Sequence, residues 1–118
     1  MATYKVHMLV YQPEYCVREV EVPDGLLGKK DLAEGITWQE YILERIFYFG
    51  QNDVRNIPGI CSVSAGDVIE YDNKYFLVRW AGYHEISEAQ YLNYLEVERE
   101  QRCQLIDTER FELFCGKS

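Results

Sequence analysis

The chain has 118 residues, with 20 acidic against 12 basic side chains and a net charge of −8. Phosphate affinity depends on Lys and Arg, so this charge argues against a general binder of free nucleic acid, and the length suits one core rather than two independent domains. Because 47% of the residues are hydrophobic and 14% aromatic, we expect one folded domain over residues 1–118 rather than a disordered acidic tail.

The N-terminal residues predict a β-hairpin. Residues 3–11 and 15–22 are rich in Val, Tyr and Thr, and residues 12–14 form a turn-prone separator. The valines of the second strand continue one apolar face, whereas its other side is expected to meet water because of Arg18, Glu19 and Glu21. Residues 24–36 contain three glycines and mixed charges, which predicts a loop with room for one helical turn.

A helix is predicted over residues 38–49. Thr37 and Glu40 form a capping box, in which each side chain can accept a hydrogen bond from the other residue's backbone N–H. Apolar residues then recur at helical spacing, namely Trp38, Tyr41, Ile42, Ile46 and Phe49. Gly50 follows the last turn, a common position for glycine. Arg45 falls inside the apolar stripe, where it reaches solvent or an internal ion pair, or, as the functional alternative, contacts an anion or carboxylate in a pocket.

The most regular stretch predicts a central hairpin. Residues 67–71 and 74–80 flank Asp72 and Asn73, which both tolerate the positive φ of a two-residue turn. This turn sets the register of the opposed pairs, which are Ile69 with Phe76, Val68 with Leu77, Glu70 with Tyr75 and Asp67 with Val78. The face expected to join the core consists of Ile69, Phe76, Val78 and Trp80.

A second helix is predicted over residues 88–102. Its capping box pairs Ser87 with Gln90. Its best apolar stripe, interrupted by charged residues, consists of Tyr91, Leu92, Leu95 and Cys103. The alternation of residues 110–114 could add an edge strand. The expected fold class is therefore a small α+β domain with two hairpins and two helices.

Four cysteines stand at positions 16, 61, 103 and 115 without a Cys-x-x-Cys pair, and the two histidines, His7 and His84, are far apart in sequence. Metal sites are usually built from local ligand pairs, so neither a metal nor a cofactor is predicted. The first residues lack the pattern of a secretory signal, and no apolar run is long enough to span a bilayer. We therefore expect a cytoplasmic protein with reduced thiols and without a membrane partner.

The most distinctive piece lies just before the central hairpin. Ser62 and Ser64 point to one side of an extended chain, Gly66 supplies a backbone angle that a Cβ would resist, and Asp67 can cap the turn. The structural interpretation is a turn that aims the hairpin. The functional alternative is a small-ligand or nucleic-acid-associated site at this turn, which would need a pocket there and a converging arginine from among Arg45, Arg55 and Arg79.

Residues 41–86 also carry a series of short motifs. They are Leu43-Glu-Arg-Ile-Phe47, Gln51-Asn52, the box Ser62-Val-Ser-Ala-Gly-Asp-Val-Ile69, the strand Lys74-Tyr-Phe-Leu-Val78, and Ala81-Gly-Tyr83. This series resembles a module common in small phage, plasmid and conjugative-element proteins, including YodL-like domains. It departs from that pattern at Ala65, where a Val is often found, and at Gly82-Tyr83, where Gly-Phe is usual. The resemblance implies an accessory protein of a mobile element and transfers no catalytic residue.

A second resemblance covers residues 75–83, which look like the strand motif of chromodomains that bind methyl-lysine in an aromatic cage. Trp80 would then be a wall of that cage. The Trp-Glu-Pro that should follow is missing, and the preceding helix is in the wrong place, so an ordinary amphipathic strand is the preferred interpretation. No catalytic residue is assigned, and an enzyme of unrecognised type stays an alternative.

Acidic residues accumulate after the central hairpin, where residues 85–112 hold eight acidic against three basic side chains. Such a surface complements a basic one on another protein. The leading hypothesis is therefore a non-enzymatic interaction module whose partner is a host or element-encoded protein with a basic surface. The contacts assigned to it include Tyr91, Glu96 and Glu100. Tyr is enriched at interfaces, and six tyrosines cannot all be core, namely Tyr11, Tyr15, Tyr48, Tyr83, Tyr91 and Tyr94.

Overall fold

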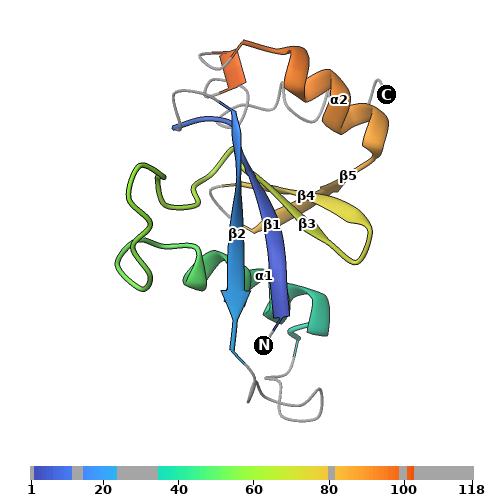
Figure 1. The fold of residues 1–118 in the computed structure, drawn as a ribbon. Coiled ribbons are helices and arrows are strands. Elements are labelled where there is room, and N and C mark those ends of the chain that lie inside the picture. Colours follow the sequence, from blue (N-terminus) through green and yellow to red (C-terminus); the bar gives the residue numbers. More distant parts are fainter. Residues whose placement is uncertain (1, 12–14, 24–34, 80–81, 99–100, 103–118) are drawn as a thin grey trace.

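The computed structural model describes residues 2–11, 15–23, 35–79, 82–98 and 101–102 (Figure 1). Its elements in chain order are β1 (Ala2–Met8), β2 (Cys16–Val22), α1 (Trp38–Phe49), β3 (Val68–Tyr71), β4 (Lys74–Val78), β5 (Tyr83–Ile86) and α2 (Glu88–Glu96). The predicted α+β class, with a hairpin, a helix, a second hairpin and a second helix, is confirmed. Residues 24–34 of the loop predicted over 24–36, the strand predicted at 110–114, and Trp80, Glu100, Cys103 and Cys115 lie outside the described residues.

The strands form one antiparallel sheet in the order β2-β1-β3-β4-β5. Both predicted hairpins are present, and the central one has the predicted register, with Ile69 opposite Phe76. Its turn residues Asp72 and Asn73 have φ angles of 54° and 59°, as their tolerance of positive φ predicts. The N-terminal hairpin joins the central one through pairing of β1 with β3, where Val6 lies opposite Ile69.

One strand was not predicted from the sequence. β5 has four residues and follows Gly82, whose φ is 89°. It pairs with β4, so that Val78 lies opposite Tyr83 and Tyr75 opposite Ile86. So short a segment carries little alternation of its own, and its pairing partner β4 is needed to define it as a strand. β5 and β2 are the edges of the described sheet.

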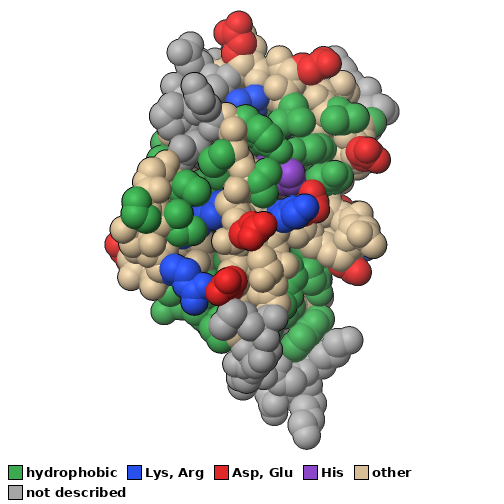
Figure 2. Space-filling model, viewed as in Figure 1, with side chains coloured by type: hydrophobic (Ala, Val, Ile, Leu, Met, Phe, Trp, Pro, Cys, Tyr) green, Lys and Arg blue, Asp and Glu red, His purple; other side chains and the backbone are tan. Residues whose placement is uncertain are grey.

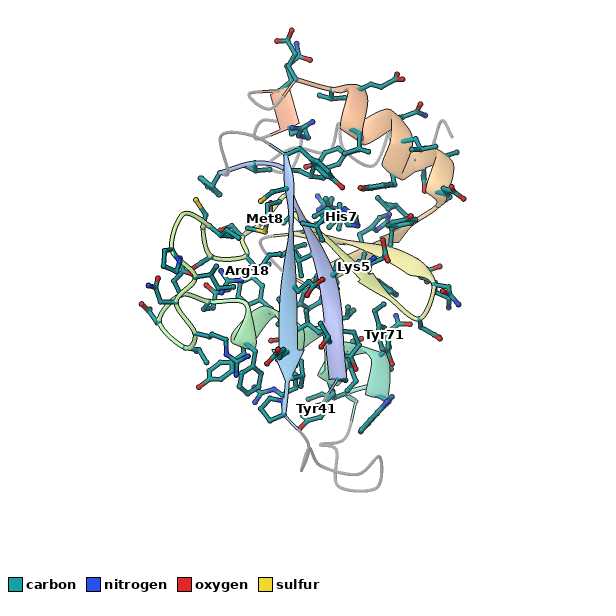
Figure 3. The ribbon with its side chains drawn as sticks, in the orientation of Figure 1. Lys5, His7, Met8, Arg18, Tyr41 and Tyr71 are labelled. Carbon is teal, nitrogen blue, oxygen red and sulfur yellow. The ribbon has the colours of Figure 1, made fainter. Side chains whose placement is uncertain are left out.

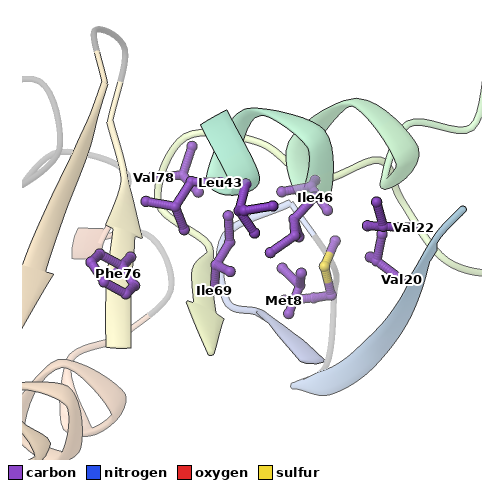
Figure 4. Packing of buried hydrophobic residues seen from close by; sticks show 11 residues of the cluster. Met8, Val20, Val22, Leu43, Ile46, Ile69, Phe76 and Val78 are labelled. Atoms are coloured by element: carbon purple, nitrogen blue, oxygen red, sulfur yellow. The ribbon is translucent and has the colours of Figure 1, made fainter. Parts of the chain in front are cut away.

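Helix α1 packs on one face of the sheet. Thr37 begins it as predicted, because its side-chain oxygen accepts a hydrogen bond from the Glu40 backbone N–H at 3.1 Å. Leu43 and Ile46 are buried and point toward β1, β2 and β3, whereas Phe76 lies to the side of the helix (Figure 4). Complete burial of an Ile or Leu side chain contributes about 1.5–3 kcal/mol.

Gly50 follows the last residue of α1, as predicted, and the reason for a glycine here is packing rather than backbone conformation. Its φ of −85° is open to any residue. A Cβ at this position would lie 2.5 Å from Cγ2 of Val63, a distance that real Cβ atoms do not reach. The missing side chain therefore lets the segment after α1 return against the end of the helix.

Helix α2 packs on the opposite face and is shorter than predicted. Its capping box is confirmed, since Ser87 N–H donates to Gln90 Oε1 at 2.7 Å and Gln90 N–H donates to Ser87 Oγ at 3.1 Å. The helix ends at Glu96 instead of residue 102, because Val97 is extended. The guanidinium of Arg102 donates to the carbonyls of Val97 at 2.5 Å and Leu95 at 3.3 Å, which satisfies carbonyls at the helix end. It also donates to Leu9 O, next to β1, at 2.7 Å.

The buried face of α2 also differs from the predicted stripe. Tyr91 and Tyr94 are buried against Leu9, Leu77 and neighbouring side chains, whereas Leu92 is 52% exposed. The two tyrosines therefore belong to the core and are not exposed interface residues. The stripe prediction holds for Tyr91 and for Leu95, which packs against the same cluster, and it is wrong for Leu92, whose place toward the sheet is taken by Tyr94. Tyr11, Tyr15 and Tyr48 are exposed.

Arg18 is the clearest correction. It was expected at the water-facing side of β2, but it is 1% exposed and lies on the same face as the buried Val20. Its guanidinium donates to Asn52 Oδ1 at 2.8 Å and to the carbonyls of Cys61 and Arg55 at 2.9 and 2.8 Å. Figure 3 shows it directed toward the segment after α1, away from His7. A buried cation thus organises that segment through oxygen atoms, and burial lowers its pKa.

Candidate functional site

A groove lies between α1 and the β4–β5 half of the sheet. It arises because α1 packs over β2 and β3, which leaves the same face of β4 and β5 only partly covered. Its volume is about 660 Å³. The helix contributes Gln39, Glu40, Leu43, Glu44 and Arg45, and the sheet contributes Phe76, Tyr83 and Glu85. We call this cavity the α1 groove.

The α1 groove carries three carboxylates and one guanidinium. Glu40, Glu44 and Glu85 are exposed at its rim, while Phe76 is buried beneath it. The Tyr83 hydroxyl is hydrogen-bonded to Glu44, and burial followed by the Glu44 charge raises the pKa of Tyr83. This contact ties β5 to α1 across the groove. The lining is therefore aromatic below and negatively charged at the rim.

Arg45 is the one predicted site residue that the structure places in this groove. Its guanidinium carbon lies 5.0 Å from the centre of the Tyr48 ring and 5.9 Å from that of Tyr41. Its Nε is buried and has no hydrogen-bond partner within the described part of the chain. The arginine is thus held by aromatic faces along α1.

A second cavity, of about 350 Å³, lies at the far end of β5, where the chain enters α2. We call it the Glu88 cavity. Its charged lining residues are Glu70, Lys74, Glu85 and Glu88, and Tyr75 and Ile86 form its apolar part. Burial, then the charges of Glu70 and Glu88, raise the pKa of Tyr75. Glu85 lines both this cavity and the α1 groove.

His7 is the centre of a buried polar network that the sequence did not indicate. Its Nε2 lies 3.0 Å from Glu70 Oε1, and its Nδ1 lies 2.7 and 2.9 Å from the hydroxyls of Tyr15 and Tyr91. The Tyr91 ring stacks on Tyr75 with centres 4.3 Å apart. Burial first, and then the Tyr15 hydroxyl, raise the pKa of Tyr91. The network fastens α2 to the sheet, so Tyr91 is engaged inside the protein.

The Ser62, Ser64 and Asp67 turn is built as a structural device. Asp67 is 1% exposed, and its two carboxylate oxygens accept hydrogen bonds from the backbone N–H groups of Leu9 and Ser64, each at 2.9 Å. Ser62 Oγ accepts from Asn52 N–H at 2.8 Å. Desolvation outweighs these bonds and raises the pKa of Asp67 to about 6. The polar atoms of the turn thus hold together chain segments that are distant in sequence.

A cavity of about 350 Å³ does lie beside this turn. Ser64 and Arg79 line it together with apolar side chains. The other two arginines named for this site lie elsewhere, since Arg45 is in the α1 groove and Arg55 pairs with Glu21 at 2.6 Å. The structure therefore brings one of the three arginines to the turn. Glu96 is exposed at the end of α2 and lines none of these three cavities.

Comparisons with models of protein families, with curated proteins and with solved structures find no match to this chain. Over the described residues, no group of three or more His, Cys, Asp or Glu side chains is arranged to hold a metal ion. Over the same residues, no helix has the length and apolar character needed to cross a membrane. Cys16 and Cys61 are half-buried, and neither forms a disulfide with another residue that the structure describes.

Proposed function

We propose that this domain is a non-enzymatic protein-interaction module that binds a basic segment of a partner in the α1 groove. The observation that carries the proposal is the combination of an aromatic floor with a carboxylate rim in a cavity of about 660 Å³. Lys and Arg side chains suit such a site, because their stems pack on rings while their charged ends meet carboxylates.

Charge also favours this class of partner. Glu40, Glu44 and Glu85 outnumber Arg45, and the whole chain has a net charge of −8. On the face shown in Figure 2, acidic and basic side chains are interspersed, so that face offers no field of one sign. Exposed ion pairs each contribute about 0.2–1 kcal/mol, so the carboxylates mainly select and steer the partner, and apolar and backbone contacts supply most of the affinity.

The resemblance to mobile-element modules adds a source for the partner. We take it to be a host or element-encoded protein in the cytoplasm, reached by a module that performs no chemistry of its own. The His7 network supports the absence of catalysis, because His7 is 7% exposed and both ring nitrogens have partners that fasten structural elements. A general base needs a proton of its substrate within hydrogen-bond reach.

The test is binding of a fluorescent eight-residue peptide of alternating Lys and Arg, compared with a Glu peptide of equal length. The groove variant Glu40→Lys/Glu85→Lys is matched by Glu19→Lys/Asp53→Lys, which changes the net charge equally at exposed positions outside the groove. We expect the groove variant to bind at least tenfold more weakly, and the matched variant within about threefold of the wild type. Equal losses in both variants, or no binding at low salt, would overturn the proposal.

A second candidate function, a small-ligand or nucleic-acid-associated site, is favoured by the cavity that Ser64 and Arg79 line. It is weaker because the turn's hydroxyls and carboxylate already serve backbone groups. Its test is a titration with a fluorescent nucleotide. Saturable binding that Arg79→Ala abolishes would support it, and the absence of saturation at millimolar nucleotide would end it.

A further inference from the structure

The outer edge of β5 presents the backbone N–H and C=O groups of every second residue. Arg79 N–H donates to Gly82 O at 3.0 Å, which closes the β4–β5 hairpin. Antiparallel pairs alternate between hydrogen-bonded and non-hydrogen-bonded, so His84 and Ile86 direct their backbone groups toward β4. Tyr83 and Glu85 direct theirs outward. Within the described residues, no other strand lies beyond β5.

The two cavities lie on opposite faces of this edge. Tyr83 and Phe76 face the α1 groove, whereas Ile86 and Tyr75 face the Glu88 cavity. Glu85 belongs to both linings, so the cavities adjoin at the strand. Successive side chains of a strand point to opposite faces. A strand added beside β5 would therefore direct its side chains alternately into the two cavities.

Both cavities have the same sign of charge. In the α1 groove three carboxylates accompany one guanidinium, and in the Glu88 cavity Glu70, Glu85 and Glu88 accompany Lys74. The Lys74 ammonium lies 3.9 Å from Glu85, a long ion pair between half-exposed side chains that leaves the carboxylate open to a second cation. Cationic side chains are accordingly complementary on both faces of the edge, and not on one face alone.

We propose that the partner segment binds as an added strand along β5, with Lys or Arg at consecutive positions that enter the α1 groove and the Glu88 cavity in turn. This inference rests on the proposed function and adds its binding mode. The two outward N–H groups and two outward carbonyls of Tyr83 and Glu85 pair with the segment's backbone, as in other cases of strand addition. The partner sequence is thus basic and extended, free of proline at the paired positions.

The experiment measures the protein's amide hydrogen exchange with and without the Lys/Arg peptide. Bound peptide is expected to slow exchange at Tyr83 and Glu85 at least tenfold, while His84 and Ile86, which already pair with β4, change little. Two variants provide an independent readout. Glu85→Pro removes an outward N–H without removing a bond to β4, and Glu85→Ala removes the carboxylate but keeps the N–H.

If a strand is added, Glu85→Pro binds the peptide at least tenfold more weakly than Glu85→Ala. Unchanged exchange at Tyr83 and Glu85 in the presence of saturating peptide, or equal binding by the two variants, overturns strand addition and leaves the proposed groove function standing. Absence of any peptide binding by the wild type overturns the proposed function itself. The exchange experiment on the wild type decides the matter if Glu85→Pro does not fold.

Discussion

Asp67→Asn tests whether desolvation or hydrogen bonding controls the one buried carboxylate in the structure's described residues. Asp67 is 1% exposed, and burial disfavours its charged form. Backbone N–H groups of Leu9 and Ser64, each at 2.9 Å, and of Val10 favour the charged form, as does the charge of Arg102. The effect of burial is the larger one, so the pKa of Asp67 rises from 3.8 to about 6. The folded protein therefore holds a proton at Asp67 that the unfolded chain has already released between about pH 4 and pH 6.

The sign follows from proton linkage. Where the native state binds more protons than the unfolded state, the free energy of unfolding falls as pH rises. A shift of about two pKa units corresponds to about 3 kcal/mol, nearly all of it lost between pH 4 and pH 7. Asn has no titrating proton, so the variant lacks this dependence. It replaces one accepting oxygen with a donor, which costs about 1–3 kcal/mol at every pH.

The assay is urea unfolding followed by tryptophan fluorescence at pH 4, 5.5 and 7 for both proteins. The stability of the wild type relative to Asp67→Asn is expected to decline by about 2–3 kcal/mol from pH 4 to pH 7. A difference that stays constant across this range would refute the reasoning. A relative stability that increases with pH would show that the backbone N–H groups dominate and that the pKa is lowered.

Three further substitutions test the packing described above. Arg18→Met leaves three oxygen acceptors without their donor and should lower the free energy of unfolding in urea by about 3 kcal/mol or more. Its control, Arg55→Met, breaks an ion pair whose side chains are 45% and 47% exposed and should lower it by less than about 1 kcal/mol. Gly50→Ala places a Cβ against Val63 and should lower stability by about 1–3 kcal/mol, and a double-mutant cycle with Val63→Ala should recover part of the loss; additive effects would contradict the contact. Tyr94→Phe removes a 2.8 Å bond to a buried carbonyl and should raise the unfolding rate and cost about 1–2 kcal/mol, so a neutral result in calorimetry would argue against that bond.

Local chemistry made the hairpins and helix starts predictable. The Asp72-Asn73 turn and the alternation around it determine a register without any distant partner, and Thr37 and Ser87 mark helix starts within four residues. The burial of Arg18 could not be predicted from local sequence, because a charged residue on a strand is expected to face solvent unless its hydrogen-bond partners are known. Those partners lie 34 to 43 residues further along the chain.

The α1 groove could not be predicted from local sequence patterns either, because its lining residues are distant in the sequence. Arg45 stood out as a cation within an apolar stripe, and that signal did lead to the α1 groove. Its carboxylates come from α1 and from β5, a strand that the sequence did not reveal, so the cavity exists only once the sheet order is known. The end of α2 was missed because Arg102, rather than a local cap, satisfies its carbonyls.

Leu9 is held from both sides by late parts of the chain. Its N–H is bound by Asp67, 58 residues downstream, and its carbonyl by Arg102, 93 residues downstream. During synthesis β1 leaves the ribosome before the other described elements, yet it lies inside the sheet between β2 and β3, and its last partner is made only when Arg102 is reached. The N-terminal hairpin therefore lacks the Arg102 bond to Leu9 O in any nascent chain that ends before Arg102.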